Sequence, residues 1–389
     1  MNEHAVVVDL GYGDAGKGTV VDWLCAGETV RAVIRFNGGA QAGHNVVTPD
    51  GRHHTFSQFG SGTFHGVPTH LSRFVVVDPL ALSTEAAALG DPYELLTIDP
   101  DALLCTPWHR AANRIRETLR GQDRHGSCGM GVGEAVAYSG VPGSEAPRVA
   151  DARSPRLLRA RLRALRDHLT DELGELGGPE ISDFVEVMRD FAEVVSITDR
   201  LPLDGPCVFE GAQGVLLDEW RGFHPYTTWS TTTFDNALEL IGGAAADAVR
   251  IGVVRTYTTR HGPGPFVTED ASLSYPEAHN GTGLWQGSFR LGHFDAVAHR
   301  YAIEVCGGVD CLAVTHCEVS VGAYCDSYST MDKIIPGPLR DLDYQERLTG
   351  KLLAARPLLT PRPPPIETLL GAPILVESHG PRTNEKKRR

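Results

Sequence analysis

The sequence has no apolar run of the roughly 18 residues that a membrane-spanning helix needs. Its first residues, MNEHAVVVDL, lack the basic start and cleavage pattern of a secretory signal. We therefore expect no membrane partner and a cytoplasmic location. The chain also lacks CxxC pairs, and the spacing of its last four cysteines around His316 fits no common zinc site. This pattern favours free thiols over a zinc centre.

Basic residues are outnumbered in this chain. It has 36 Lys and Arg against 49 Asp and Glu, a net charge of −13. Because a nucleic-acid coat needs a basic face, the balance argues against a nucleic-acid partner, although a local pocket for a small phosphate compound stays open. With 389 residues, 41% of them hydrophobic, the chain can bury a large core in one α/β domain with insertions or in two domains.

Short apolar segments alternate with helical patterns. The strongest helix is expected at 154–176, where leucines recur at helical spacing and Ser154 with Pro155 supplies a cap and the first turn. The alternation predicts an α/β fold with a mostly parallel central sheet and helices on both faces. The charged tail NEKKRR is expected to be frayed. Strands are expected at 6–10, 31–36, 73–82, 248–257 and 311–316, and 206–217 is expected to be a strand that breaks into a glycine turn.

A glycine-rich loop, GYGDAGKG at 11–18, follows the first expected strand. It contains the G-x-x-x-x-G-K spacing of a phosphate-binding loop, whose N–H groups converge on phosphate oxygens while Lys17 adds positive charge. The usual Ser or Thr after the lysine is missing, since Gly18 stands there and Thr19 comes one later. Asp14 is unusual here, because a carboxylate repels phosphate unless a cation lies between them. A plain tight turn is the alternative.

A second glycine turn, RFNGGAQAGHNVV at 35–47, follows another expected strand and contains His44. A histidine among Gly, Ala and Asn has few packing partners, which favours catalysis over a structural role. Together, GYGDAGKG and NGGAQAGHN closely resemble the two signature segments of adenylosuccinate synthetases, GTP-dependent ligases of purine synthesis. Further segments resemble that family in order: GSCGMGVGEAVAY (126–138), VFEGAQGVLLDEWRGFHPYTTWSTTT (208–233), TRHGPGPFVTE (259–269), THCE (315–318) and SHGP (378–381).

The resemblance implies a single synthetase-like domain over 1–389, with a P-loop-like central sheet and inserted subdomains. Its parts would be nucleotide loops in 1–50, a helical insertion at about 150–200 and a guanine-binding part at about 310–389. It also implies a homodimer.

The resemblance further implies a mechanism. Asp14 would remove a ring proton from a 6-oxopurine nucleotide, whose oxygen then attacks the γ-phosphate of GTP. His44 would stabilise charge on the transferring phosphoryl group. Mg²⁺ would be held by Asp14 and the backbone carbonyl of Gly43, which explains the carboxylate in the loop. The amine of an amino acid, aspartate in the family, then displaces the 6-phosphoryl group. Lys17 and Gln213 complete the expected catalytic set.

The remaining expected contacts are also carried over from the resemblance. Glu318 would accept the two N–H groups that distinguish guanine from adenine. The expected GTP-binding residues are Gly13, Ala15, Gly16, Lys17, Gly18, Thr19, His316, Glu318, Ser378 and Gly380. The expected substrate-binding residues are Asp14, Gln41, Ser127, Cys128, Arg148, Gln213, Thr228 and Arg290.

Several positions depart from the family. Ala15 stands where a glutamate is usual, and His316 replaces a lysine of the guanine pocket. Only Arg148 is available for the arginine that a partner subunit would contribute. The amino-acid loop, NGTGLWQGSFRLGHFD at 280–295, keeps one arginine, Arg290, of a family cluster that clamps the aspartate carboxylates. Either the missing charges come from elsewhere, with Arg260 and His261 as candidates, or the nucleotide acceptor or amine donor is altered, which the rewriting favours.

Two other functions stay open. One is a GTP-binding module without activity, which would need neither Asp14 nor His44. The other is an ordinary P-loop NTPase, against which the missing Ser or Thr after Lys17 counts.

Overall fold

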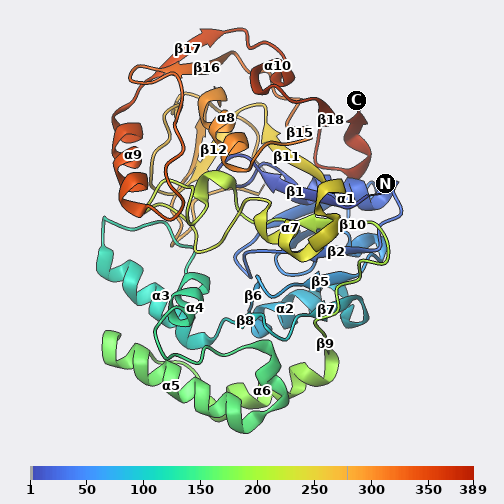
Figure 1. Cartoon of the computed structure of the whole chain (residues 1–389), viewed down its shortest axis with the longest axis vertical. Helices are drawn as coiled ribbons and strands as arrows, with labels where there is room; N and C mark the ends of the chain where they lie inside the picture. The colour runs from blue at the N-terminus through green and yellow to red at the C-terminus, as the bar shows by residue number, and fades with distance from the viewer. Residues whose placement is uncertain (1–2, 278) are drawn as a thin grey trace.

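The computed structural model describes residues 3–277 and 279–389. Within this part of the chain, ten strands form a central sheet (Figure 1). Neighbouring strands are parallel, except for the final pair in the order given next, which is antiparallel. In spatial order the strands are β9 (Ser196–Ile197), β7 (Leu96–Ile98), β5 (Thr69–Leu71), β2 (Ala32–Arg35), β10 (Cys207–Glu210), β1 (Ala5–Asp9), β11 (Val249–Arg255), β15 (Cys311–Thr315), β18 (Ile374–Ser378) and β19 (Lys386–Arg388).

Helices and small sheets surround this sheet. The helices are α1 (Lys17–Gly27), α2 (Pro79–Leu89), α3 (Pro107–Arg120), α4 (Val132–Ser139), α5 (Pro155–Leu173), α6 (Ile181–Val194), α7 (Asp235–Ile241), α8 (Ala296–Val305), α9 (Leu342–Ala354) and α10 (Ile366–Leu370). The remaining strands pair as β3 (His44–Val47) with β4 (His53–Phe56), β6 (Val76–Val77) with β8 (Leu103–Leu104), β12 (Thr258–His261) with β13 (Phe289–Gly292), and β16 (Ala323–Tyr328) with β14 (Phe294–Asp295) and β17 (Pro357–Pro361).

The central strand β1 explains why helices lie on both faces of the sheet. All five of its residues, AVVVD, are buried, so neither face meets water. Val6 and Val8 belong to an apolar cluster with residues of α7 and α8, whereas Ala5 and Val7 pack in another with residues of α1. Because side chains alternate along a strand, these clusters lie on opposite faces. The expected α/β fold with a mostly parallel sheet is confirmed.

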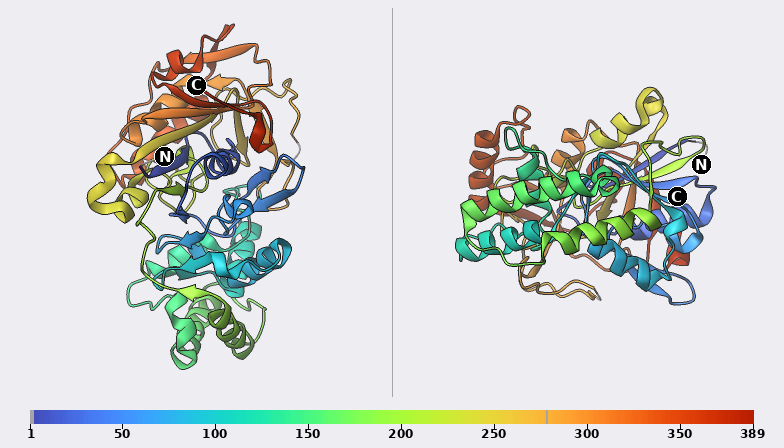
Figure 2. Two further views of the ribbon diagram at one scale, coloured as in Figure 1. Left: turned by 90° about the vertical axis from the view of Figure 1, so that its right-hand side faces the viewer. Right: turned by 90° about the horizontal axis from the view of Figure 1, so that it is seen from below.

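Helices α5 and α6 form one end of the molecule and lie side by side when seen from below (Figure 2). The buried leucines of α5 are Leu158, Leu162, Leu165 and Leu169, which recur every three or four residues as the sequence predicted. They share an apolar cluster with Trp108 of α3 and Phe184 of α6. A separate layer of β14, β16 and β17 lies at the opposite end, beside α10. The expected domain boundaries stay a prediction.

Three local expectations were wrong. The strand expected at 73–82 is limited to β6, because Asp78 accepts hydrogen bonds from the N–H groups of Leu80 and Ala81 and so starts α2. The tail is not frayed: Lys386–Arg388 pairs with β18 as the edge strand β19. Ser154 makes no side-chain cap on α5, although Pro155 does begin the helix.

The topology places three loops together. The neighbouring strands β2, β10 and β1 are parallel, so the segments that follow their carboxyl ends meet at one edge of the sheet. Those segments are the ones that carry His44, Gln213 and the glycine loop. No helix in the described part of the chain combines the length and apolar character that crossing a bilayer demands.

The buried stripe of α5 can be tested with two leucines of the same helix. Leu162 is 0% exposed and Leu157 is 40% exposed. We expect Leu162→Ala to lower the free energy of unfolding by about 2–5 kcal/mol, because it leaves a cavity, while Leu157→Ala changes it far less. Denaturant unfolding followed by circular dichroism measures both values. Equal losses would contradict this packing.

Candidate active site

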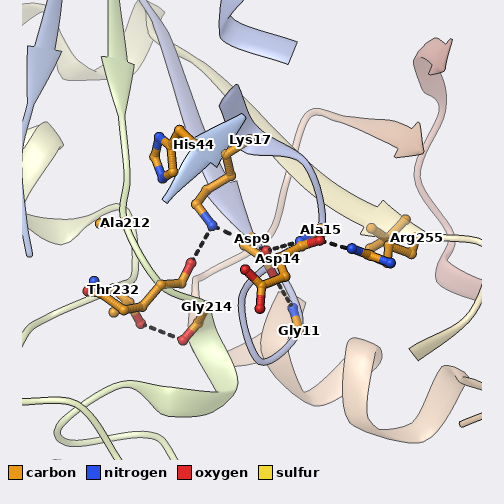
Figure 3. A network of polar contacts seen from close by, with 12 residues as sticks. Asp9, Gly11, Asp14, Ala15, Lys17, His44, Ala212, Gly214, Thr232 and Arg255 are labelled. Atoms are coloured by element: carbon orange, nitrogen blue, oxygen red, sulfur yellow. Dashed lines mark hydrogen bonds and ion pairs between the residues drawn. The ribbon is translucent and has the colours of Figure 1, made fainter. Parts of the chain in front are cut away.

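The glycine loop after β1 is organised by one buried carboxylate. Asp9, 1% exposed, accepts hydrogen bonds from the backbone N–H groups of Gly11 and Ala15, each at 2.8 Å. The ammonium group of Lys17 lies 3.2 Å from the same side chain (Figure 3). The loop thereby turns back on the end of its own strand, and Asp14 is held at its tip with a positive φ of 60°.

Lys17 also ties this loop to the turn after β10. Its Nζ donates to the backbone carbonyl of Gln213 at 2.6 Å, so the ammonium lies between two loops (Figure 3). The loops pack closely enough to require glycine at 214, since a Cβ there would lie 2.3 Å from the carbonyl oxygen of Gly11. The placement of Lys17 is therefore fixed by contacts from both sides.

His44 is the first residue of β3 and is 5% exposed. Its Nδ1 lies 2.5 Å from Oε1 of Glu210, the last residue of β10. The carboxylate also accepts hydrogen bonds from the N–H and hydroxyl groups of Ser61. Glu210 thus fixes the ring with Nδ1 protonated, which leaves Nε2 for a ligand.

The charges of this pair follow from its surroundings. Burial lowers the pKa of His44, and Glu210 opposes that effect. Burial alone would raise the pKa of Glu210, but His44 and Arg35 hold it below its usual value. We conclude that the carboxylate is ionised and that the imidazole is neutral until an anion approaches it.

Asp14, in the glycine loop, lines the same cavity as His44. Its side chain is 33% exposed, and Oδ2 lies 3.5 Å from Nε2 of His261. Arg255 donates from Nε to the backbone carbonyl of Asp14 at 2.7 Å. Burial raises the pKa of this carboxylate. The nearby His261, Arg255 and Lys17 act to lower the pKa, but burial has the larger effect. A raised pKa suits a group that must accept a proton.

Two adjoining cavities, of about 370 and 490 Å³, surround these groups. Both are lined by Gln41 and Gln213, so they meet at these glutamines. Oε1 of Gln41 and both amide atoms of Gln213 are buried without a hydrogen-bond partner. Buried polar atoms of this kind are normally paired. Their orphaned state therefore marks the junction as a place where a polar ligand binds.

Most residues singled out from the sequence come together around the cavities. Those lining the first are Gly13, Asp14, Gly16, Lys17, Gly18, Thr19, Gln41, Gly43, His44, Gln213, His316, Glu318, Ser378 and Gly380. Those lining the second are Gln41, Ser127, Cys128, Gln213 and Thr228.

Three candidates line neither cavity. The N–H of Ala15 is taken by Asp9. Arg148 precedes a short 3-10 turn, and its guanidinium bonds to the carbonyl of Asp101. Arg290 of β13 contacts Glu269 at 2.7 Å and the carbonyl of Gly264 at 2.9 Å. Any ligand role for these residues needs a different arrangement, such as a second subunit beside Arg148, and stays a prediction.

Sequence reasoning gave no role to Asp9 or Glu210, which hold the loop and the imidazole. Both are carboxylates at the carboxyl end of an apolar strand. A charged residue at that position is costly to bury unless it has a partner, so its presence was a signal that could have been used. The sequence could not name the partner of Glu210, because His44 is 166 residues away.

Comparison with known proteins identifies the family of this chain. The family model described as adenylosuccinate synthetase matches residues 6–347. The adenylosuccinate synthetase of Acidithiobacillus ferrooxidans is 34% identical over 344 residues, covering 83% of this chain and 79% of that protein. That of Marinomonas sp. (strain MWYL1) is 32% identical over 399 residues, covering 96% and 89%.

Two solved structures share the fold. A fully ligated adenylosuccinate synthetase from Plasmodium falciparum has a TM-score of 0.83 at 20% identity and covers 100% of both chains. A succinoaminodeoxyadenylate synthetase (PurZ) of cyanophage S-2L, bound to dGMP and dATP as an energy donor, has a TM-score of 0.64 at 20% identity, covering 100% of this chain and 95% of that one.

The fold and the matched sequence define a nucleotide-dependent ligase. The chain belongs to the adenylosuccinate synthetase family. The resemblance seen in the two glycine segments is therefore confirmed.

Two glycines of α1 test the contact between that helix and His44. A Cβ on Gly18 would lie 2.8 Å from the Cβ of His44, whereas a Cβ on Gly27 meets nothing within 4 Å. We expect Gly18→Ala to displace His44 and to lower the ligase rate by about 10-fold or more, since small misplacements of catalytic groups are costly. Gly27→Ala is the control and should keep the wild-type rate. A wild-type rate in both variants, measured as phosphate release from GTP, would contradict the contact.

Proposed function

We propose that this protein is a GTP-dependent C–N ligase that acts on a 6-oxopurine nucleotide, IMP or an analogue, and on the amine of aspartate or a related amino acid. One observation carries the proposal: Asp14 and His44, supplied by separate loops, line the cavity of the phosphate-binding loop, and this cavity adjoins a second one. A proton acceptor and an imidazole there suit phosphoryl transfer between two nucleotides.

GTP is assigned to the first cavity. Its phosphates would lie at the N-terminus of α1, where backbone N–H groups, the helix dipole and Lys17 favour anions. The cavity extends to Glu318, whose carboxylate suits the paired N1–H and N2–H donors of guanine. Burial acts to raise the pKa of Glu318, but the hydrogen bond from His316 lowers it below its usual value. His316 thus supports the ionised acid in this pocket.

The acceptor nucleotide is assigned to the second cavity. Thr228, Ser127 and Cys128 would surround its 5′-phosphate, and the purine would point toward the junction. There the unpartnered amides of Gln41 and Gln213 can each pair with a polar edge of the base. This orientation presents the 6-oxo group to Asp14 and His44.

The chemistry then has two steps. Asp14 accepts the N1 proton, the purine oxygen bonds to the γ-phosphorus of GTP, and the bond from that phosphorus to the bridging oxygen breaks to release GDP. His44, oriented by Glu210, donates to phosphoryl oxygens as negative charge develops. The free amine next bonds to C6 and loses a proton, and the bond from C6 to oxygen breaks to release inorganic phosphate.

Magnesium fits this site. Mg²⁺ in phosphoryl-transfer enzymes is bound by one or two protein oxygens together with substrate phosphates. Asp14 and Gly43 line the same cavity and can supply a carboxylate and a carbonyl oxygen. No cluster of three or more His, Cys, Asp or Glu side chains suited to a metal occurs in the described ranges, as expected if phosphates complete the ligand set. The ion would neutralise charge on the polyphosphate.

The proton acceptor can be tested with a matched pair of aspartates. Asp14 and Asp91 both have positive φ, 60° and 58°. We expect Asp14→Asn to lower the rate of phosphate release from GTP, in the presence of Mg²⁺, an oxopurine nucleotide and an amine, by about 10²–10⁴-fold. Exposed Asp91→Asn should leave it unchanged.

Omission experiments separate the alternative functions. The ligase requires the oxopurine nucleotide for phosphate release, so removing IMP or chelating Mg²⁺ should stop the reaction. Equal GTP hydrolysis without a second nucleotide would instead identify an NTPase. Binding of GTP without any turnover would identify a GTP-binding module.

A further inference from the structure

We propose that the amine donor of this enzyme carries at most one carboxylate, so that it is not a dicarboxylic amino acid. This inference rests on the proposed ligase function. It follows from the charges available where the two cavities meet, because the donor must reach C6 of the purine there.

Arginine is the side chain best suited to binding a carboxylate, since it offers paired donors in one plane. Among the described residues, four arginines line the two cavities: Arg116, Arg120, Arg255 and Arg260. The first two contact carboxylates of this chain, Arg116 with Glu134 and Arg120 with Glu117. Neither therefore presents an uncompensated positive charge.

Arg260 is committed to the fold. It is 2% exposed and donates to the backbone carbonyls of Pro263 at 3.0 Å, Pro265 at 3.1 Å and Tyr226 at 3.3 Å. Its guanidinium also lies 4.3 Å from the centre of the Tyr12 ring. These contacts use all three of its nitrogens. Arg260 therefore cannot turn toward a donor without losing its hydrogen bonds to these backbone carbonyls.

Arg255 is committed as well. Figure 3 shows its side chain directed at the backbone of Asp14, and its Nη1 contacts Glu277 and, at 2.8 Å, the hydroxyl of Tyr257. Its charge is thus matched by Glu277, which itself lines the first cavity. Glu277 also accepts a hydrogen bond from Asn280 at 3.0 Å.

The wall beside Asp14 therefore carries two acids. Burial acts to raise the pKa of Glu277, but Arg255 lowers it below its usual value, so this acid is ionised. Because Glu277 already takes the charge of Arg255, the described residues beside Asp14 offer no free arginine to a donor with two carboxylates.

The groups left to hold a donor are polar rather than strongly basic. His261 lies against Asp14 and has a buried Nδ1 without a partner. Gln286 lines both cavities, and His279 and Asn280 line the first. These imidazoles and amides can bind a single carboxylate, or a neutral amide, but they include no arginine or lysine for a second carboxylate.

Asparagine and aspartate make the sharpest comparison, because they are nearly the same size and differ by one charge. With GTP, Mg²⁺ and IMP, and products followed by mass, we expect the best of glycine, alanine, serine, asparagine and glutamine to exceed aspartate in kcat/KM by about 10-fold or more, and asparagine itself to exceed aspartate. A preference for aspartate, or no use of any single-carboxylate amine, overturns the proposal.

Failure of the proposed function has a separate signature. Phosphoryl transfer to the purine can be followed without any amine, as exchange of labelled oxygen between the bridging and non-bridging positions of the β-phosphate of GTP. If the exchange requires IMP and the enzyme prefers aspartate, the donor proposal is wrong and the ligase function still holds. If exchange and product formation are both absent, the ligase function itself is wrong.

A charge inserted at the junction gives the reverse test. We expect Gln286→Arg to raise the ratio of kcat/KM for aspartate to that for asparagine by about 10-fold, because it supplies the missing guanidinium. Leu284→Arg is the matched control: it adds the same charge two residues away, on a side chain that is 81% exposed and lines neither cavity, and should leave the ratio unchanged. An unchanged ratio in Gln286→Arg contradicts this placement of the donor.

Discussion

The buried ion pair between Asp9 and Lys17 is the interaction on which this site depends. Two charges removed from water are costly, and they persist only when each has further hydrogen bonds. Asp9 has the amides of its own loop, and Lys17 has the carbonyl of Gln213. Loss of either partner would leave a buried charge uncompensated and release two loops at once. The pair therefore joins the stability of the sheet edge to the placement of the reacting groups.

The parallel sheet makes such a pair useful. Neighbouring strands from distant parts of the sequence end at the same edge, so a carboxylate on β1 and a backbone carbonyl beyond β10 can bind one ammonium. The same arrangement lets Glu210 orient a histidine that enters from beyond β2. Lys17 and His44 are thus each held by a group on, or directly after, a neighbouring strand.

The sequence was sufficient for the parts of the site that local spacing determines. The glycine loop, Asp14, Lys17 and His44 lie in two short segments with a recognisable glycine spacing, and the fold class followed from alternating apolar segments. Contacts between distant segments could not be predicted, such as the contact of Arg290 with Glu269, and the expected ligand role of Arg290 stays a prediction. The mistaken strand at 73–82 has a local cause. Asp78 and Pro79 start a helix there, and a prediction based on apolar content alone does not detect that start. The residue roles stay proposals.

The last strand has a practical consequence. Lys386 of β19 donates from Nζ to the carbonyls of Gly380 and Arg382, and Gly380 lines the cavity assigned to GTP. Arg389 contacts Glu377 on the neighbouring strand. Removing Lys386 and the residues after it would therefore uncover the edge of β18 and free the carbonyl of Gly380, which lines that cavity.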